Sequence, residues 1–171
     1  MADRMIDLEA LGLRSGEAAW REMELSPVPP VLGGEELSLE TEPVVVRVDI
    51  SRTSSGFALR LRAQTVLVGT CARCLGPARL VADIEAREVD QGEVSEDDEL
   101  SSPYVNDEVL DPEAWLHDAL VLALPERLIC RQDCAGLCEV CGISLNDLEP
   151  GTHVHEREPD PRFAKLRDLL E

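Results

Sequence analysis

The sequence predicts an α+β fold: an antiparallel β meander with one packed helix and a cysteine-rich segment. Three observations favour it. Three stretches between residues 44 and 89 alternate apolar with polar side chains, a strong helix start stands near residue 112, and six cysteines gather at two places. The chain has 171 residues, 44% of them hydrophobic but only 3% aromatic. It is therefore long enough for an ordinary domain whose core is mainly aliphatic.

Composition divides the chain into parts. Residues 1–36 are expected to form an N-terminal extension that packs on or flanks the core, and residues 37–171 are expected to form the main domain. Within this domain we expect an acidic loop over 90–110 and a loop-rich zinc-binding segment over 130–155.

The N-terminal extension is mixed in character. Ser15 can cap a short helix that carries Trp20 and Met23. Residues 27–30 contain three prolines and would end this helix, because proline lacks the amide donor and restricts the residue before it. Gly33–Gly34 then marks a turn.

Three strands are expected to follow, over residues 44–50, 57–68 and 79–89. In each of them apolar side chains recur at every second position, which is typical of a strand with one buried and one solvent-exposed face. Because the joints are short, consecutive strands are expected to pair as an antiparallel meander. The apolar positions are Val44, Val46, Val48, Ile50, Phe57, Leu59, Leu61, Ala63, Leu80, Ala82, Ile84 and Ala86.

The remaining elements are set by charge and by capping signals. Residues 90–111 are strongly acidic, which predicts a long exposed loop. Asp111 and Pro112 together are typical of a helix start, with a capping carboxylate before a proline at the first helical position. Pro125 is expected to end that helix, and a last short helix is expected from Asp160–Pro161.

The cysteines carry the strongest functional signal. Two CxxC pairs, one CxxxC pair and one HxH pair provide eight candidate ligands, the number that two tetrahedral zinc ions need. The abundance of thiolates favours closed structural sites, so we expect one or two structural Zn²⁺ ions. The candidate ligands are Cys71, Cys74, Cys130, Cys134, Cys138, Cys141, His153 and His155.

Spacing alone leaves the pairing of these ligands open. The 71/74 pair can join 130/134, which leaves 138/141 with 153/155. Alternatively, 71/74 can join 138/141 as in a zinc ribbon, with 130/134 left for the histidines or free. Disulfides and a thioredoxin-like redox pair are weaker interpretations, because neither a secretory signal nor a βαβ pattern accompanies the cysteines. His117 is expected to lie on the polar flank of the helix and to take no part in metal binding.

The charge balance indicates the kind of partner. The chain has 35 acidic and 16 basic residues, a formal net charge of −19. Such a field repels nucleic acid, so direct RNA binding is disfavoured, and it attracts basic proteins. No apolar run is long enough for a membrane span, and the N-terminus lacks the apolar run of a signal peptide. We therefore expect a cytoplasmic protein without a membrane or small-molecule partner.

Several motifs together give the chain a resemblance to the YceD family, over roughly residues 40–171. The resemblance implies a role in accumulation of 23S ribosomal RNA and hence in large-subunit biogenesis, with a basic ribosomal protein or a pre-large-subunit particle as partner. Some members have further cysteines where this chain has Thr152–His155, which makes the histidines substitute ligands. The motifs are Cys71–Leu75, Leu120–Pro125, Cys130–Gly142, Leu145–Asn146 and Asp160–Leu166.

We therefore predict a non-catalytic factor in ribosome biogenesis. Two other hypotheses remain: an RNA-processing enzyme acting on precursor ribosomal RNA, and a redox-sensing zinc switch. The enzyme is disfavoured because no motif pairs a nucleophile with a histidine and an acid, and because the carboxylates of residues 90–111 are expected to be solvated.

Overall fold

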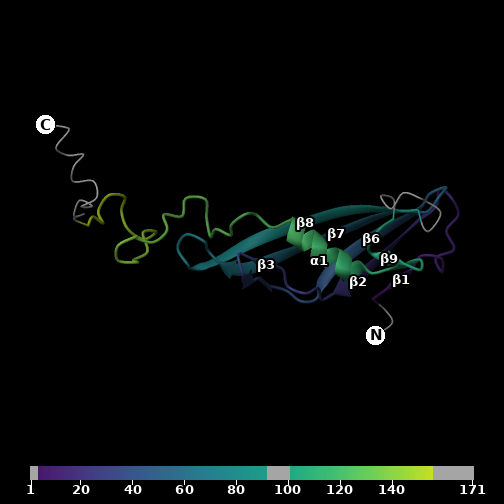
Figure 1. The fold of residues 1–171 in the computed structure, drawn as a ribbon, viewed down its shortest axis with the longest axis horizontal. Helices are drawn as coiled ribbons and strands as arrows, with labels where there is room; N and C mark the ends of the chain where they lie inside the picture. Colours follow the sequence, from purple (N-terminus) through teal and green to yellow (C-terminus); the bar gives the residue numbers. More distant parts are fainter. Residues whose placement is uncertain (1–3, 92–100, 156–171) are drawn as a thin grey trace, which may run out of the picture.

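A computed structural model describes residues 4–91 and 101–155. The expected last helix from Asp160–Pro161 and the acidic residues 93–99 lie outside the described residues. Within the described part, antiparallel sheets and one helix form an α+β fold, as the sequence predicts. The cysteine-rich segment extends beyond one end of the main sheet (Figure 1).

The predicted meander is confirmed. It consists of β6 (Val44–Arg52), β7 (Phe57–Thr70) and β8 (Pro77–Asp90), and each strand pairs antiparallel with the next. The apolar positions face one side of the sheet and form the core, because alternate side chains of a strand point to opposite faces. Val46, Val48, Ile50 and Leu61 are fully buried there.

The helix expected from Ser15 is wrong. Residues Ala18–Leu25 form strand β2, which pairs with β6 along its whole length, from Ala18 opposite Ser51 to Leu25 opposite Val44. Pairing at eight positions stabilises the strand more than the weak local helix signal favours a helix, because it also provides hydrogen-bond partners for the backbone amides and carbonyls of β6.

Short strands complete this side of the molecule. The strands β3 (Val31–Leu32) and β4 (Glu35–Glu36) form a hairpin, and β5 (Ser38–Leu39) pairs with β7. The predicted turn at Gly33–Gly34 is confirmed as the loop of this hairpin, with φ of 63° and 89°. Two successive residues with positive φ favour glycine in a tight hairpin.

The stretch predicted as an acidic loop contains two short strands near its C-terminal end. The strands β9 (Val105–Asn106) and β10 (Val109–Leu110) form a hairpin, and β10 pairs with β1 (Ile6–Asp7). Asp107 and Glu108 form the turn with φ of 46° and 62°. The pairing with β1 joins residues about a hundred positions apart, a contact that local sequence patterns do not encode.

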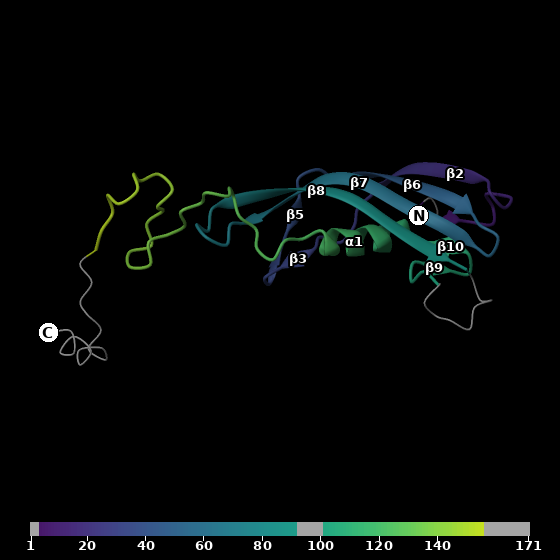
Figure 2. The same cartoon turned by 90° about the horizontal axis from the view of Figure 1, so that it is seen from above.

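The helix α1 (Pro112–Leu122) packs on the apolar face of the sheet, and the described residues place no helix on the opposite face (Figure 2). The helix begins after Asp111 and ends before Pro125, as predicted. Its buried side includes Trp115, Leu116 and Leu120. The His117 Nδ1 lies 2.8 Å from the Val28 carbonyl oxygen, and the contact ties α1 to the segment after β2.

The helix cap can be tested directly. Asp111 accepts hydrogen bonds from the backbone amides of Glu113 at 3.1 Å and Ala114 at 3.0 Å. Asp111→Ala should lower the free energy of unfolding by about 1 kcal/mol, since two helix amides lose their acceptor. Urea denaturation of the variant, compared with Asp111→Asn as a capping control, measures the effect. Equal losses in both variants would contradict the capping role.

Candidate metal centres

Two groups of four potential ligands come together in the structure. The β7–β8 turn supplies Cys71 and Cys74, and the segment after α1 supplies the other six ligands. In each group the ligand atoms lie within 4.8 Å of one another. The first group joins 71/74 with 130/134, and the second joins 138/141 with 153/155. Of the two pairings that the spacing leaves open, the structure thus assembles the first.

The first centre lies against the end of the core. The Sγ atoms of Cys71 and Cys134 are 3.9 Å apart, and those of Cys74 and Cys130 are 3.7 Å apart. A tetrahedral zinc ion with bonds of about 2.3 Å to sulfur separates its sulfurs by about 3.8 Å. The four thiols therefore fit such an ion. Cys71 is fully buried and belongs to the hydrophobic core, as does Cys134.

The turns around the two CxxC pairs repeat one hydrogen-bond pattern. In the first turn the Cys71 amide donates to the Gly76 carbonyl at 2.8 Å, and the Leu75 amide donates to the Cys71 carbonyl at 3.0 Å. In the second turn the Cys138 amide donates to the Ile143 carbonyl at 2.8 Å. The Gly142 amide likewise donates to the Cys138 carbonyl at 2.9 Å. Both turns are therefore built alike, although one joins long strands and the other lies in a loop.

Each turn also aims an amide at its first sulfur. The amide of Arg73 lies 3.5 Å from Cys71 Sγ, and that of Val140 lies 3.4 Å from Cys138 Sγ. Amides directed at sulfur favour the thiolate, the form that binds metal. This shared pattern independently indicates that both turns are built to present thiolates.

Positive φ falls at the fifth residue of each turn. Gly142 occupies this position in the second turn with φ of 72°. In the first turn the corresponding residue is Leu75, with φ of 58°, and not Gly76. A Cβ on Gly76 would lie 3.5 Å from Cys74 Sγ, an ordinary van der Waals contact, so space at this position does not require glycine. Leu75 is 67% exposed, so its side chain gains little from burial.

The thiols of the first centre have divergent acidities. Burial raises the pKa of Cys71, but amides of Cys74, Arg73 and Cys130 directed at its sulfur lower that pKa to about 6. Burial and the neighbouring thiols raise the pKa of Cys130 to about 12. Without a cation, one thiolate therefore suppresses ionisation of its neighbour. A divalent ion would remove this conflict, because its charge favours thiolate at every ligand.

The second centre is more exposed than the first. The amides of Cys141 and Val140 lower the pKa of Cys138 to about 6. The Cys141 Sγ lies 3.2 Å from His153 Nε2, which lies 2.9 Å from His155 Nε2. These separations are a few tenths of an ångström below the edges of a tetrahedral zinc site, about 3.6 and 3.3 Å. A small opening of the two rings would accommodate an ion.

Sequence reasoning missed the part that Asn146 plays at the first centre. Its Nδ2 lies 3.5 Å from Cys134 Sγ, and its Oδ1 accepts a hydrogen bond from the Ala135 amide at 2.8 Å. Arg73 adds a hydrogen bond to the Cys134 carbonyl at 3.0 Å. Such contacts orient a ligand without binding the ion. The position of Asn146 directly after the cysteine cluster was the available signal.

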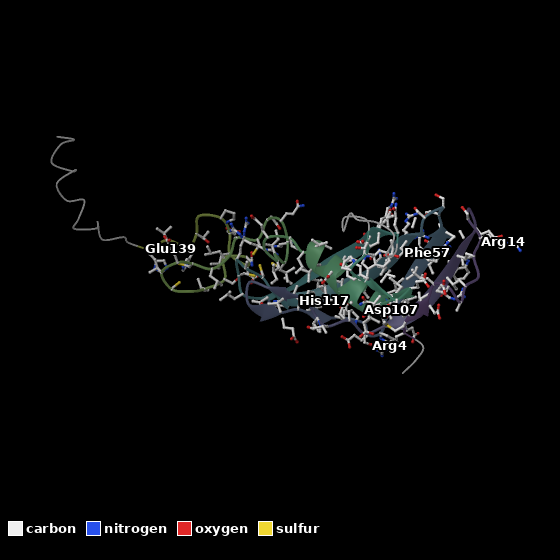
Figure 3. The ribbon with its side chains drawn as sticks, turned by 45° about the vertical axis from the view of Figure 1, so that its right-hand side comes forward. Arg4, Arg14, Phe57, Asp107, His117 and Glu139 are labelled. Carbon is white, nitrogen blue, oxygen red and sulfur yellow. The ribbon has the colours of Figure 1, made fainter. Side chains whose placement is uncertain are left out.

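The two centres join different parts of the chain. The first connects the β7–β8 turn with the start of the cysteine-rich segment, whereas the second lies wholly within that segment. In Figure 3, Glu139, in the second CxxC turn, lies at the far end of the segment from Phe57 and the sheet. The first centre is therefore placed to hold the segment to the core, and the second to shape its tip.

Comparison with known families identifies the chain. The sequence profile described as "Large ribosomal RNA subunit accumulation protein YceD" matches residues 59–170. The chain belongs to the YceD family. The match includes the β7–β8 turn and the described cysteine-rich segment, residues 130–155.

Relatives of this YceD protein occur in mycobacteria. Proteins of Mycobacterium tuberculosis and Mycobacterium bovis, described as uncharacterized, are 35% identical over 173 residues, covering 96% of this chain and 80% of each relative. A Mycobacterium leprae protein, also uncharacterized, is 48% identical over 67 residues, 39% of this chain and 30% of that relative. No solved structure gives a significant match. Among the described residues, no helix is long and apolar enough to cross a membrane.

Proposed function

We propose that this YceD protein is a non-catalytic factor that supports accumulation of 23S ribosomal RNA by associating with a basic ribosomal protein or a pre-large-subunit particle. The family match is the observation that carries the role. The two groups of four ligands support the further proposal that two structural zinc ions hold the C-terminal part of the protein in place.

The pairing of its arginines supports a protein partner over RNA. A basic patch for direct RNA contact would have to come from arginines of β7, β8 and the turn that joins them, where Arg73 already donates to the Cys134 carbonyl at 3.0 Å. Arg60 donates to Glu85 at 2.7 Å, Arg62 donates to Asp49 at 2.6 Å, and Arg79 is paired with Glu40. These cations already have anionic partners within the chain. Phosphate binding would have to displace those partners against a net charge of −19.

Association with a basic partner should depend strongly on salt. Charges on exposed surfaces are screened within about 8 Å at physiological ionic strength. We expect the association rate with immobilised large-subunit ribosomal proteins to fall about tenfold or more between low and physiological salt, while dissociation changes less. Biolayer interferometry at several salt concentrations measures both rates.

The control replaces the proteins with protein-free 23S RNA. Little binding to this RNA is expected at either salt concentration. Tight, sequence-selective binding to the naked RNA without any protein would contradict the proposal and favour direct RNA recognition.

A redox-sensing zinc switch is the second candidate function. The sulfur pairs of the first centre, at 3.7 and 3.9 Å, are close enough for disulfides after a small rotation, if an oxidant removes the ion. Metal content before and after treatment with peroxide separates the two hypotheses. Reversible loss of metal at low peroxide concentration would favour the switch, whereas retention would favour a purely structural role.

A further inference from the structure

Strand β2 ends the main sheet, and among the described residues its pairing partner is β6 alone. The Arg52 amide donates to the Glu17 carbonyl at 2.9 Å, and the Arg52 carbonyl accepts from the Gly16 amide at 2.9 Å, so the backbone groups of Arg52 face the β2 side of the ladder. Along an antiparallel ladder hydrogen-bonded pairs alternate with pairs whose backbone groups point outward. The outward-pointing amides and carbonyls of this edge are therefore those of Ala18, Trp20, Glu22 and Glu24.

One outward group already has a substitute partner. The Trp20 carbonyl accepts a hydrogen bond from the guanidinium of its neighbour Arg21 at 3.0 Å. This guanidinium occupies the place that the amide of a further strand would take. A shallow groove of about 660 Å³ lies at the same place, and it is lined by residues 18–22 alone. The edge of β2 thus offers both unpaired backbone and open space.

The other long edge of the sheet is protected. The amide of Cys71 donates to Gly76, so the odd-numbered residues of β8 point their backbone groups outward. This edge begins with Pro77 and carries charges of both signs, which natural sheets use to prevent strand addition. The charged positions are Arg79, Asp83, Glu85 and Arg87.

We propose that the free edge of β2 accepts an extended segment of a basic protein as an added β-strand. The side chains of Trp20, Glu22 and Glu24 share one face, because they alternate along the strand. Trp20 is 54% exposed, and Arg47 lies over its ring at 4.7 Å, which holds the ring on this face. An incoming strand would therefore place an apolar side chain beside Trp20 and basic side chains beside the two glutamates.

This inference rests on the proposed function in one respect, the basic character of the partner. A second copy of the chain fits less well, because two chains of net charge −19 repel each other. Strand addition supplies affinity through backbone hydrogen bonds and specificity through alternate side chains. The partner segment is thus defined as extended, with basic side chains two residues apart opposite Glu22 and Glu24 and an apolar side chain at the next position of that face, opposite Trp20.

A designed peptide tests the edge on the full-length protein. The probe matches β2 in length and places lysine opposite Glu22 and Glu24 and valine opposite Trp20, all three on one face. Its twin carries N-methyl groups on the amides that would face β2, so it keeps charge and side chains but lacks donors. The protein has two tryptophans, and Trp115 is only 1% exposed, so a change in fluorescence reports on Trp20. We expect the twin to bind about tenfold or more weakly.

Matched variants test the same edge from the protein side. The Glu22 amide points away from β6, so Glu22→Pro removes an edge donor without breaking the ladder. Glu22→Gln removes the same charge and keeps the donor. We expect Glu22→Pro to bind the probe about tenfold more weakly than Glu22→Gln, and Arg21→Ala to bind about threefold more tightly because it frees the Trp20 carbonyl.

These measurements distinguish strand addition at β2 from general charge attraction, from dimerisation and from failure of the proposed function. Equal binding of the probe and its methylated twin would overturn the proposal in favour of general charge attraction, whatever the fold of the variants. Concentration-dependent dimers that Glu22→Pro abolishes would overturn it in favour of a second copy. If ribosomal proteins still bind Glu22→Pro normally, docking lies elsewhere and the proposed function stands. If they do not bind the unaltered protein, the proposed function fails.

Discussion

On the proposal that each centre holds one zinc ion, Cys71→Ser should reduce the zinc content from two ions per chain to one and lower the free energy of unfolding by about 3–5 kcal/mol. Cys71 is fully buried at the end of β7 and lies 3.9 Å from Cys134. Loss of its thiolate therefore releases both the ion and the link between the sheet and the cysteine-rich segment. Elemental analysis and chemical denaturation in the presence of zinc measure the two effects.

The second centre provides a matched control. Cys141→Ser should also cost one ion, but it should leave the unfolding of the sheet nearly unchanged, since Cys141 is exposed and all four members of its group lie within the segment. With zinc removed by a chelator, Cys71→Ser and the unaltered protein should become similar in stability. Zinc content clearly below one ion in protein never exposed to chelator would refute the metal proposal.

Trp115→Ala should be the most damaging change in the core, with a loss of about 3–5 kcal/mol. Trp115 is the largest fully buried side chain, and its ring stacks on Tyr104 with centroids 5.9 Å apart. The substitution would leave a cavity between α1 and the sheet. It would also remove the ring against which Tyr104, in the segment before the helix, stacks. Thermal unfolding followed by circular dichroism measures the loss.

His117→Ala serves as the comparison on the same helix. It removes the contact to the Val28 carbonyl but no core packing, so we expect a loss of about 1 kcal/mol or less. Similar losses for Trp115→Ala and His117→Ala would show that α1 is not anchored by its apolar side.

The meander and the helix α1 could be predicted from the sequence because their signals are local. Alternation with a period of two marks the strands from Val44 onward, and Asp111 with Pro112 marks the helix start. The cysteine pairs were recognisable for the same reason, because two thiols separated by two residues can meet one ion through a single turn. For these features the sequence alone was sufficient.

Partners distant in the chain were decided by tertiary structure. Residues 18–25 form a strand because they pair with the backbone of β6. Likewise, β10 pairs with residues near the N-terminus. The grouping of 71/74 with 130/134 followed from where α1 places the segment after it. Spacing along the chain does not encode which of several distant pairs will meet, because only the packed sheet and helix determine the distance between them.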